Sequence, residues 1–214
     1  MTALTVDTPQ GPARVHLHQA DDPRAAVALG HGAGGGVEAP DLVAATEAAL
    51  SEGVRVALVE QPYRVAGRRS PPQAAKLDAA WAAVVDHLRA KKLSGLPLIV
   101  GGRSAGARVA CRTAEATDAA AVLCLAFPLQ PSPRRSATRP VESRLPELDA
   151  VGVPTLVVQG ERDRFGLPPD GPAREVVVVP GDHGLKTDPE AVKAAVTEWL
   201  SRVVRRAAPI AASG

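Results

Sequence analysis

The sequence has few aromatic residues, and neither sign of charge dominates it. Aromatic residues make up only 2% of the 214 residues, which leaves little material for the platforms on which nucleic-acid bases stack. The formal net charge is +2, whereas nucleic-acid-binding domains are usually strongly basic. The composition therefore argues against a nucleic-acid partner.

Cysteine and long apolar runs are scarce as well. The only two cysteines, Cys111 and Cys124, lie in apolar stretches, so we interpret them as reduced core residues rather than as a disulfide framework or a zinc site. No segment approaches the roughly 18 apolar residues of a membrane span, and the first residues lack the basic start and apolar run of a secretory signal. We therefore predict a cytoplasmic protein with neither a membrane segment nor a bound metal.

The rest of the composition suits one globular domain. Hydrophobic residues make up 45% and charged residues 22% of the chain, as in ordinary folded domains, and the length fits a single domain. We expect this domain to span residues 1–206 and residues 207–214 to form a disordered tail.

Short apolar runs alternate with stretches of helical periodicity. Apolar residues at i, i+3, i+4 spacing predict helices over 72–92 and near the C-terminus, and further helices are expected over 41–51 and after Ser104. The predicted strands are 4–6, 15–17, 26–29, 55–59, 96–100, 121–126, 155–158 and 175–179. Strands that are apolar throughout are typical of parallel sheets covered by helices on both faces. This order predicts an α/β fold with a doubly wound, mostly parallel sheet that begins with an antiparallel hairpin.

The clearest chemical motif is G-x-S-x-G, formed by Gly102-Arg103-Ser104-Ala105-Gly106. It follows an apolar strand and precedes a helical stretch, which is the context of a nucleophile elbow. The two glycines would leave room where the helix approaches the strand, and the first amides of the helix would face developing negative charge. We predict that Ser104 is a nucleophile held in a strained turn.

A serine hydroxyl needs a base to take its proton, and an acid must orient that base. His183 follows the predicted strand 175–179 and is the candidate base. Asp163 follows the strand 155–158 and is the candidate acid, with Glu161 and Asp170 as alternatives. The order Ser104, Asp163, His183 along the chain is the order of a hydrolase triad on an α/β sheet.

A glycine-rich loop, Gly30-His31-Gly32-Ala33-Gly34-Gly35-Gly36, follows the strand 26–29. In such folds this loop provides one backbone N–H of the oxyanion hole, and the residue after the nucleophile provides the other. We assign these amides to Ala33 and Ala105, with Gly32 as the alternative to Ala33. His31 is interpreted as a residue that holds the loop in place rather than as a second base.

The same loop matches a rival pattern. The glycines of Gly30-x-Gly32-x-x-Gly35 follow a strand, as in a dinucleotide-binding fingerprint, and Glu60 ends the next strand. Gly36 and Pro40 disturb the place where the helix of such a fold runs, and this interpretation leaves the serine, the acid and the base without roles. A non-catalytic, hydrolase-like binding module is the other alternative.

On these motifs the chain resembles the α/β-hydrolases, and most of all the small lidless branch related to dienelactone hydrolases and to the hydrolase-like family that includes testis-expressed proteins. The matching stretches are HGAGGG at 31–36, QPYR at 61–64, GGRSAGAR at 101–108, FPLQP at 127–131, VVQGERDRFG at 157–166 and GDHGLK at 181–186. The resemblance implies the α/β-hydrolase fold and a triad of Ser104, Asp163 and His183. The family often has Met-Gly-Gly-Arg after the serine, where this chain has Ala105-Gly106-Ala107-Arg108.

The interval 128–151 is too short and too polar for a helical cap domain, so we expect an open site. An open site favours small, soluble esters, thioesters or lactones, a small-molecule acyl substrate that needs no cofactor. We predict that Arg103, Gly32 and Tyr63 contact this substrate, with Arg103 binding a carboxylate through its guanidinium fork. The basic loop with Arg134, Arg135, Arg139 and Arg144 is interpreted as solvated surface, with an acidic partner as the minor alternative.

Overall fold

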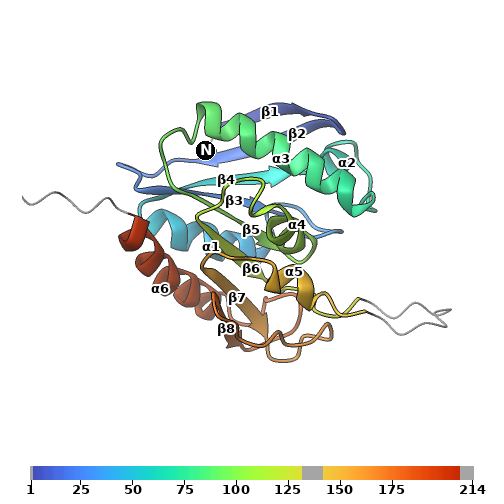
Figure 1. Ribbon diagram of the computed structural model, residues 1–214, viewed down its shortest axis with the longest axis vertical. Helices are drawn as coiled ribbons and strands as arrows, with labels where there is room; N and C mark the ends of the chain where they lie inside the picture. Colours follow the sequence, from blue (N-terminus) through green and yellow to red (C-terminus); the bar gives the residue numbers. More distant parts are fainter. Residues whose placement is uncertain (1, 132–141, 208–214) are drawn as a thin grey trace, which may run out of the picture.

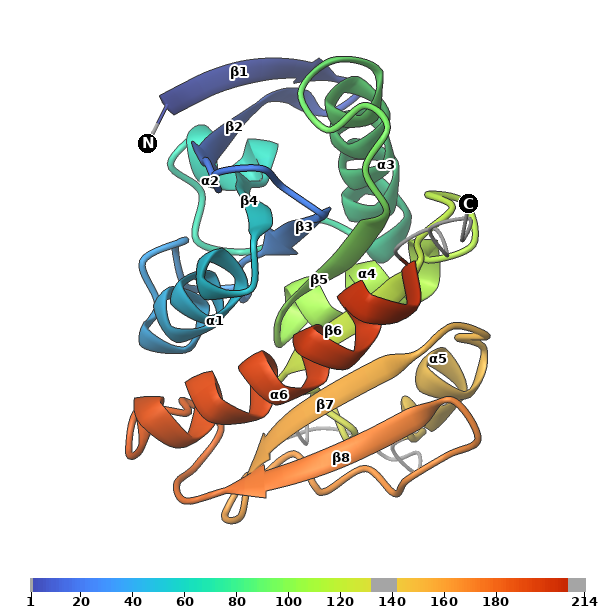
Figure 2. The same cartoon turned by 90° about the vertical axis from the view of Figure 1, so that its left-hand side faces the viewer.

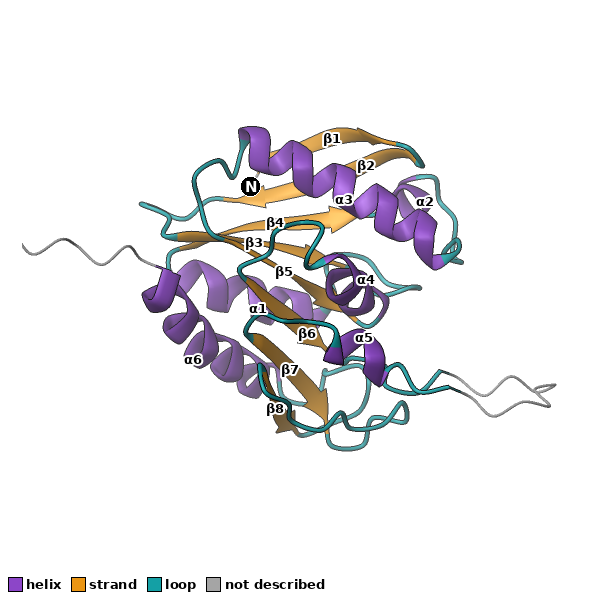
Figure 3. Cartoon of the chain, viewed as in Figure 1, coloured by secondary structure: helices purple, strands orange, loops and turns teal. Residues whose placement is uncertain are grey.

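A single eight-stranded sheet forms the centre of the protein in the computed structural model, which describes residues 2–131 and 142–207. The strands are β1 (Thr2–Thr8), β2 (Gly11–His18), β3 (Ala25–Gly30), β4 (Val54–Glu60), β5 (Leu98–Arg103), β6 (Ala121–Leu125), β7 (Thr155–Gly160) and β8 (Arg174–Val179). They lie in the order β1-β2-β4-β3-β5-β6-β7-β8. The pairs β1–β2 and β2–β4 are antiparallel and the others parallel, which confirms the predicted sheet and its hairpin (Figure 3).

Helices cover both faces of this sheet, as predicted. They are α1 (Pro40–Ser51), α2 (Pro62–Val65), α3 (Ala74–Lys91), α4 (Ala105–Thr113), α5 (Leu145–Asp149) and α6 (Pro189–Ala207). Helices α3 and α4 lie on one face, and α1 and α6 lie side by side on the other (Figures 1 and 2). None of the helices in the described ranges is long and apolar enough to cross a membrane.

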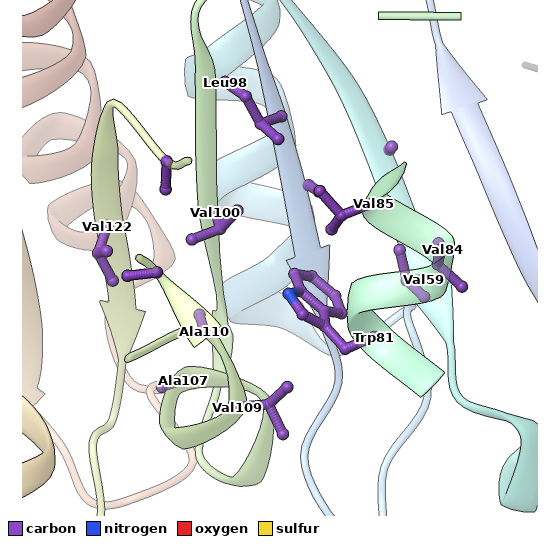
Figure 4. Close-up of a cluster of buried hydrophobic side chains, with 14 of the residues drawn as sticks. Val59, Trp81, Val84, Val85, Leu98, Val100, Ala107, Val109, Ala110 and Val122 are labelled. Carbon is purple, nitrogen blue, oxygen red and sulfur yellow. The ribbon is translucent and has the colours of Figure 1, made fainter. Parts of the chain in front are cut away.

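The core explains why the central strands are apolar throughout. In β5, Leu98 and Val100 pack into the cluster under α3 and α4, whereas Ile99 between them packs toward α1 and α6. Successive side chains of a strand point to opposite faces, so a strand with helices on both sides buries every side chain. Trp81 of α3 lies against the end of β3 and is 1% exposed (Figure 4). Burial of each such large side chain contributes about 1.5–3 kcal/mol.

The structure differs from the expectations at the end of β5 and in one additional short helix. Strand β5 continues through Gly101 and Gly102 to Arg103 instead of ending near residue 100, because its glycines lie against the neighbouring backbones where a Cβ has no room. The four-residue helix α2 is too short for a periodic pattern to predict it. The expected tail 207–214 lies outside the described residues, apart from Ala207 at the end of α6.

No cap domain covers the carboxyl edge of the sheet in the described residues. Between β6 and β7 the structure describes one short helix, α5, and its flanking loops. This agrees with the expected lidless form of the fold. Cys111 and Cys124 are buried free thiols, as predicted, with their sulfur atoms 3.5 Å apart.

Candidate active site

Ser104 lies at the sharp turn between β5 and α4. Its backbone has φ 51° and ψ −105°, a left-handed conformation that costs a non-glycine residue about 1–3 kcal/mol. The Ser104 N–H donates to the carbonyl of Leu125 at 2.9 Å. A Cβ on either Gly102 or Gly106 would collide with the backbone oxygen of Gly30. The glycines therefore permit the close approach of helix and strand that was expected from the motif.

The structure brings Ser104, His183 and Asp163 together at the carboxyl ends of β5, β7 and β8. His183 Nε2 lies 2.9 Å from Ser104 Oγ, and His183 Nδ1 lies 2.7 Å from Asp163 Oδ2. A carboxylate only accepts, so Nδ1–H donates to it and Nε2 is left to accept the serine proton. This is the relation between groups that a Ser-His-Asp triad requires.

Asp163 is fixed by two further hydrogen bonds. Its side chain is fully buried, Gln159 Nε2 donates to its Oδ2 at 2.8 Å, and the Phe165 N–H donates to its Oδ1 at 2.9 Å. The ring of Phe165 also meets the His183 imidazole edge-on, with 4.4 Å between centroids. Sequence reasoning missed both residues. Gln159 could have been singled out from the sequence, because it is a polar residue in an otherwise apolar strand.

The two alternative acids lie elsewhere and have other partners. Glu161 pairs with Arg162 at the surface, and Asp170 accepts the N–H of Val176 at 2.8 Å. The geometry thus selects Asp163 among the three carboxylates considered.

His31 controls the direction of the Ala33 amide. Its Nδ1–H donates to the carbonyl of Gly32 at 2.8 Å, and its Nε2 accepts the Gln61 N–H at 3.1 Å. The peptide bond is planar and trans, so holding the Gly32 oxygen also orients the N–H of Ala33 on the opposite side. Burial lowers the pKa of His31 below its ordinary 6.5, which keeps the ring neutral for these two bonds. The interpretation of His31 as a residue that holds the loop agrees with this geometry.

Tyr63 fixes the next peptide of the same loop. Its hydroxyl donates to the Ala33 carbonyl at 2.8 Å. Burial raises the pKa of Tyr63 to about 12, so the hydroxyl keeps its proton and remains a donor.

Ala33, Ala105 and Ser104 share the wall of one cavity of about 290 Å³. The N–H of Ala105 belongs to the first residue of α4, where helical amides have no intrahelical partner. The two backbone groups assigned to an oxyanion hole therefore flank the serine on a common surface. Arg108, Arg112, Arg144 and Phe165 are among the other lining residues, together with Pro71, Pro72, Ala74, Leu77 and Pro128.

None of the three residues predicted to contact substrate is among the described residues that line this cavity. Arg103 points away from it: its Nε lies 2.8 Å from Asp41 Oδ2, and its Nη2 donates to the His183 carbonyl at 3.0 Å. Gly32 lies against the Arg103 guanidinium, and Tyr63 is buried. For these residues substrate contact stays a prediction, and their partners favour roles in holding the loops.

The dinucleotide alternative needs a helix that begins within the glycine turn. Helix α1 begins at Pro40, beyond the last of these glycines, and residues 31–39 form an irregular loop. In the described part of the chain no three His, Cys, Asp or Glu side chains gather as metal ligands would. The loop geometry thus favours an oxyanion hole over a dinucleotide site.

The chain also matches a known protein family. Residues 23–208 match the family described as an alpha/beta hydrolase domain. The chain belongs to this alpha/beta hydrolase family. A search of the curated proteins finds no match.

Solved structures of other proteins share the fold of this chain. A serine hydrolase without lid from Xanthomonas campestris is 21% identical with a TM-score of 0.73, covering 94% of each chain. Est1E from Butyrivibrio proteoclasticus is 19% identical with a TM-score of 0.76, covering 96% of this chain and all of that one. A dienelactone hydrolase from Anabaena variabilis is 17% identical with a TM-score of 0.70, covering 94% and 96%. These likenesses establish the lidless fold.

Two arginines of the cavity wall belong to an ion-pair network. Arg108 of α4 pairs with Glu147 of α5, and Arg112 pairs with Glu147 and with Asp78 of α3. Arg144, which precedes α5, donates to the carbonyl of Pro128 at 3.0 Å. The sequence interpretation of Arg144 as solvated surface is therefore wrong, since the residue is half-buried and lines the cavity. The other arginines of that loop lie outside the described residues.

Proposed function

We propose that the protein is a serine hydrolase that cleaves small esters, thioesters or lactones through an acyl-enzyme on Ser104. The observation that carries the proposal is the continuous hydrogen-bonded chain from Ser104 to His183 to Asp163, opening into a cavity flanked by two backbone amides. The family membership supports a hydrolase, and the geometry supports the roles of these residues.

In the first half-reaction, His183 Nε2 takes the hydroxyl proton as Ser104 Oγ attacks the acyl carbon. Asp163 stabilises the imidazolium, and the amides of Ala33 and Ala105 receive the negative charge on the carbonyl oxygen. His183 then gives the proton to the leaving group, and the acyl group remains on the serine.

In the second half-reaction, a water molecule takes the position that the leaving group has vacated. His183 takes a proton from the water, hydroxide adds to the acyl carbon, and the proton passes to Ser104 Oγ as the carboxylic acid leaves. The proposal is supported by the distances between these groups, which are at most 2.9 Å along the chain of hydrogen bonds, and by the cavity that Ser104, Ala33 and Ala105 line. No cofactor takes part.

The size of the cavity supports a small substrate. A volume of about 290 Å³ accepts a short acyl chain but no long one, so turnover of 4-nitrophenyl esters should not rise once the chain exceeds about eight carbons. A buried apolar channel would instead gain about 0.8 kcal/mol for each added methylene. The cytoplasmic location expected from the two cysteines stays a prediction.

Labelling by a fluorophosphonate tests the proposal directly. Wild-type protein should gain one phosphonyl group by intact mass and hydrolyse 4-nitrophenyl acetate, whereas Ser104→Ala should do neither, with kcat lowered on the order of 10⁴–10⁶-fold. Ser94→Ala, at an exposed loop serine, is the matched control and should behave as wild type.

Labelling that is absent, or that persists in Ser104→Ala, would overturn the proposal. A folded protein that binds acyl compounds without turnover would point to the non-catalytic module. Tight binding of NAD(H) or flavin would point to the dinucleotide alternative.

A further inference from the structure

Three guanidinium groups line the cavity beside Ser104, and no carboxylate lines it among the described residues. They belong to Arg108 and Arg112 of α4 and to Arg144 before α5. A positively charged wall next to the nucleophile is unexpected for a site that takes only neutral esters, because desolvating charge for a neutral ligand costs free energy.

Two of these arginines already have acidic partners. Arg108 and Arg112 share Glu147, and Arg112 also pairs with Asp78, so three elements of the fold are joined by this network. Their side chains are 26% and 19% exposed. These two cations are neutralised within the protein.

Arg144 differs from them in having no carboxylate partner among the described residues. Within those residues its guanidinium makes one hydrogen bond, to the carbonyl of Pro128. The neighbouring segment 132–141, whose sequence is Ser-Pro-Arg-Arg-Ser-Ala-Thr-Arg-Pro-Val, contains no Asp or Glu that could serve as one. Burial and the nearby charges of Arg108 and Arg112 lower the pKa of Arg144, although Glu147 opposes them. A negatively charged ligand group beside Arg144 would offset both the cost of burying its charge and the repulsion from Arg108 and Arg112.

We propose that Arg144 binds an oxyanion of the substrate, so that this hydrolase prefers acyl donors that carry a carboxylate or phosphate group over neutral ones. The proposal rests on the proposed serine-hydrolase function. Guanidinium binds both kinds of oxyanion through paired N–H donors. Because Arg144 and Ser104 line the same cavity of about 290 Å³, the anionic group and the reacting carbonyl belong to one small molecule.

Three matched esters test the preference. They are 4-nitrophenyl pentanoate, which is neutral, mono-4-nitrophenyl glutarate, which ends in a carboxylate, and 4-nitrophenyl 4-phosphonobutanoate, which ends in a phosphonate. Wild-type kcat/KM should be at least about tenfold higher for one of the anionic esters than for the neutral ester, which corresponds to about 1.4 kcal/mol. The better of the two anionic esters identifies the oxyanion.

Arg144→Met should bring that ratio down about tenfold while leaving hydrolysis of the neutral ester in place, and Arg144→Lys should keep part of the preference. Arg202→Met is the matched control, because it removes one arginine charge from α6 on the opposite face, and it should keep the wild-type ratio. An equal ratio in wild type and Arg144→Met, with Ser104-dependent hydrolysis of the neutral ester intact, would overturn the oxyanion site and leave the proposed function standing.

If no Ser104-dependent hydrolysis is seen, a binding measurement still tests the oxyanion site at Arg144 separately from the proposed hydrolase function. Ligand-observed NMR then compares mono-4-nitrophenyl glutarate and the phosphonate ester on Ser104→Ala and on Ser104→Ala with Arg144→Met. Binding that is lost with Arg144 supports the oxyanion site, and equal binding overturns it. If Arg144→Met does not fold, Arg144→Gln takes its place in every comparison.

Discussion

Arg103, which precedes Ser104 in the chain, and Arg144, which lines the same cavity as Ser104, carry the same charge in different surroundings. Arg103 lies next to the fully buried carboxylate of Asp41 and donates to the carbonyl of His183. Arg144 has a backbone carbonyl of Pro128 as its hydrogen-bond partner and lines the cavity. Arg103 is adjacent to the nucleophile in sequence, yet its charge is neutralised inside the protein. The partners of a charged group, rather than its distance from the nucleophile along the chain, decide whether it is available to a ligand.

The largest effect should come from breaking the pair on the Arg103 side. Asp41→Asn removes the carboxylate and leaves the Arg103 guanidinium, 18% exposed, without its counter-charge. We expect the free energy of unfolding to fall by about 3 kcal/mol, because an uncompensated buried charge remains. Urea denaturation measures this. Asp118→Asn, which breaks an exposed pair with Arg89, should cost at most about 1 kcal/mol, and equal losses in the two variants would contradict the contrast.

A smaller effect, and one with a pH signature, is expected at His31. His31→Gln should lower the free energy of unfolding by about 2 kcal/mol at pH 8, since a buried hydrogen bond is disturbed. Burial lowers the folded-state pKa of His31, so below about pH 6.5 the unfolded state binds a proton that the folded state resists, and wild-type stability falls as the pH falls.

The variant lacks this titration, so the difference in unfolding free energy between wild type and His31→Gln should shrink as the pH is lowered from 8 toward 5.5. Chemical denaturation at a series of pH values measures the difference. A difference that is constant or grows toward acid would show that His31 is not the buried neutral group inferred here.

The sequence predicted the eight strands, the four longer helices and the three residues that meet at the sheet edge. Strand ends and turn glycines are local signals, and in a parallel sheet the residues after Val100, Val158 and Val179 must share one edge, so spacing along the chain was enough. The same argument placed Ala33 and Ala105 near the serine. The proposed roles of these residues await the labelling experiment.

Side-chain direction could not be predicted in the same way. Arg103 was expected to face the substrate because it neighbours Ser104, but adjacent residues point in different directions at a sharp turn. Arg144 was interpreted as loop surface because its sequence neighbours are polar, whereas its place in the cavity wall depends on α5 packing against α4, a contact between segments far apart in sequence. Tyr63 likewise acts on a loop that lies 30 residues away in sequence and that only tertiary structure brings to it.

A third, smaller effect is expected at Tyr63. Tyr63→Phe removes the hydrogen bond to the Ala33 carbonyl, which should cost about 1 kcal/mol of stability. The peptide between Ala33 and Gly34 would also become less fixed, and with it the N–H of Ala33 in the preceding peptide. Because an oxyanion-hole amide acts in the transition state, kcat for the neutral ester should fall several-fold with KM little changed. Steady-state kinetics measure the split. A change confined to KM would instead indicate that Tyr63 contacts the substrate, as the sequence had predicted.

The smallest effect on stability should come from Arg144, and it sharpens the comparison with Arg103. Arg144→Met removes one hydrogen bond to a carbonyl, but it also removes the repulsion between Arg144 and the charges of Arg108 and Arg112. Because these two changes oppose each other, the free energy of unfolding should stay within about 0.5 kcal/mol of wild type. Urea denaturation under the conditions used for Asp41→Asn measures it. A loss near 3 kcal/mol would mean that Arg144 holds the fold as the Asp41–Arg103 pair does. A near-zero loss together with a changed ester preference means that this guanidinium is retained for a ligand.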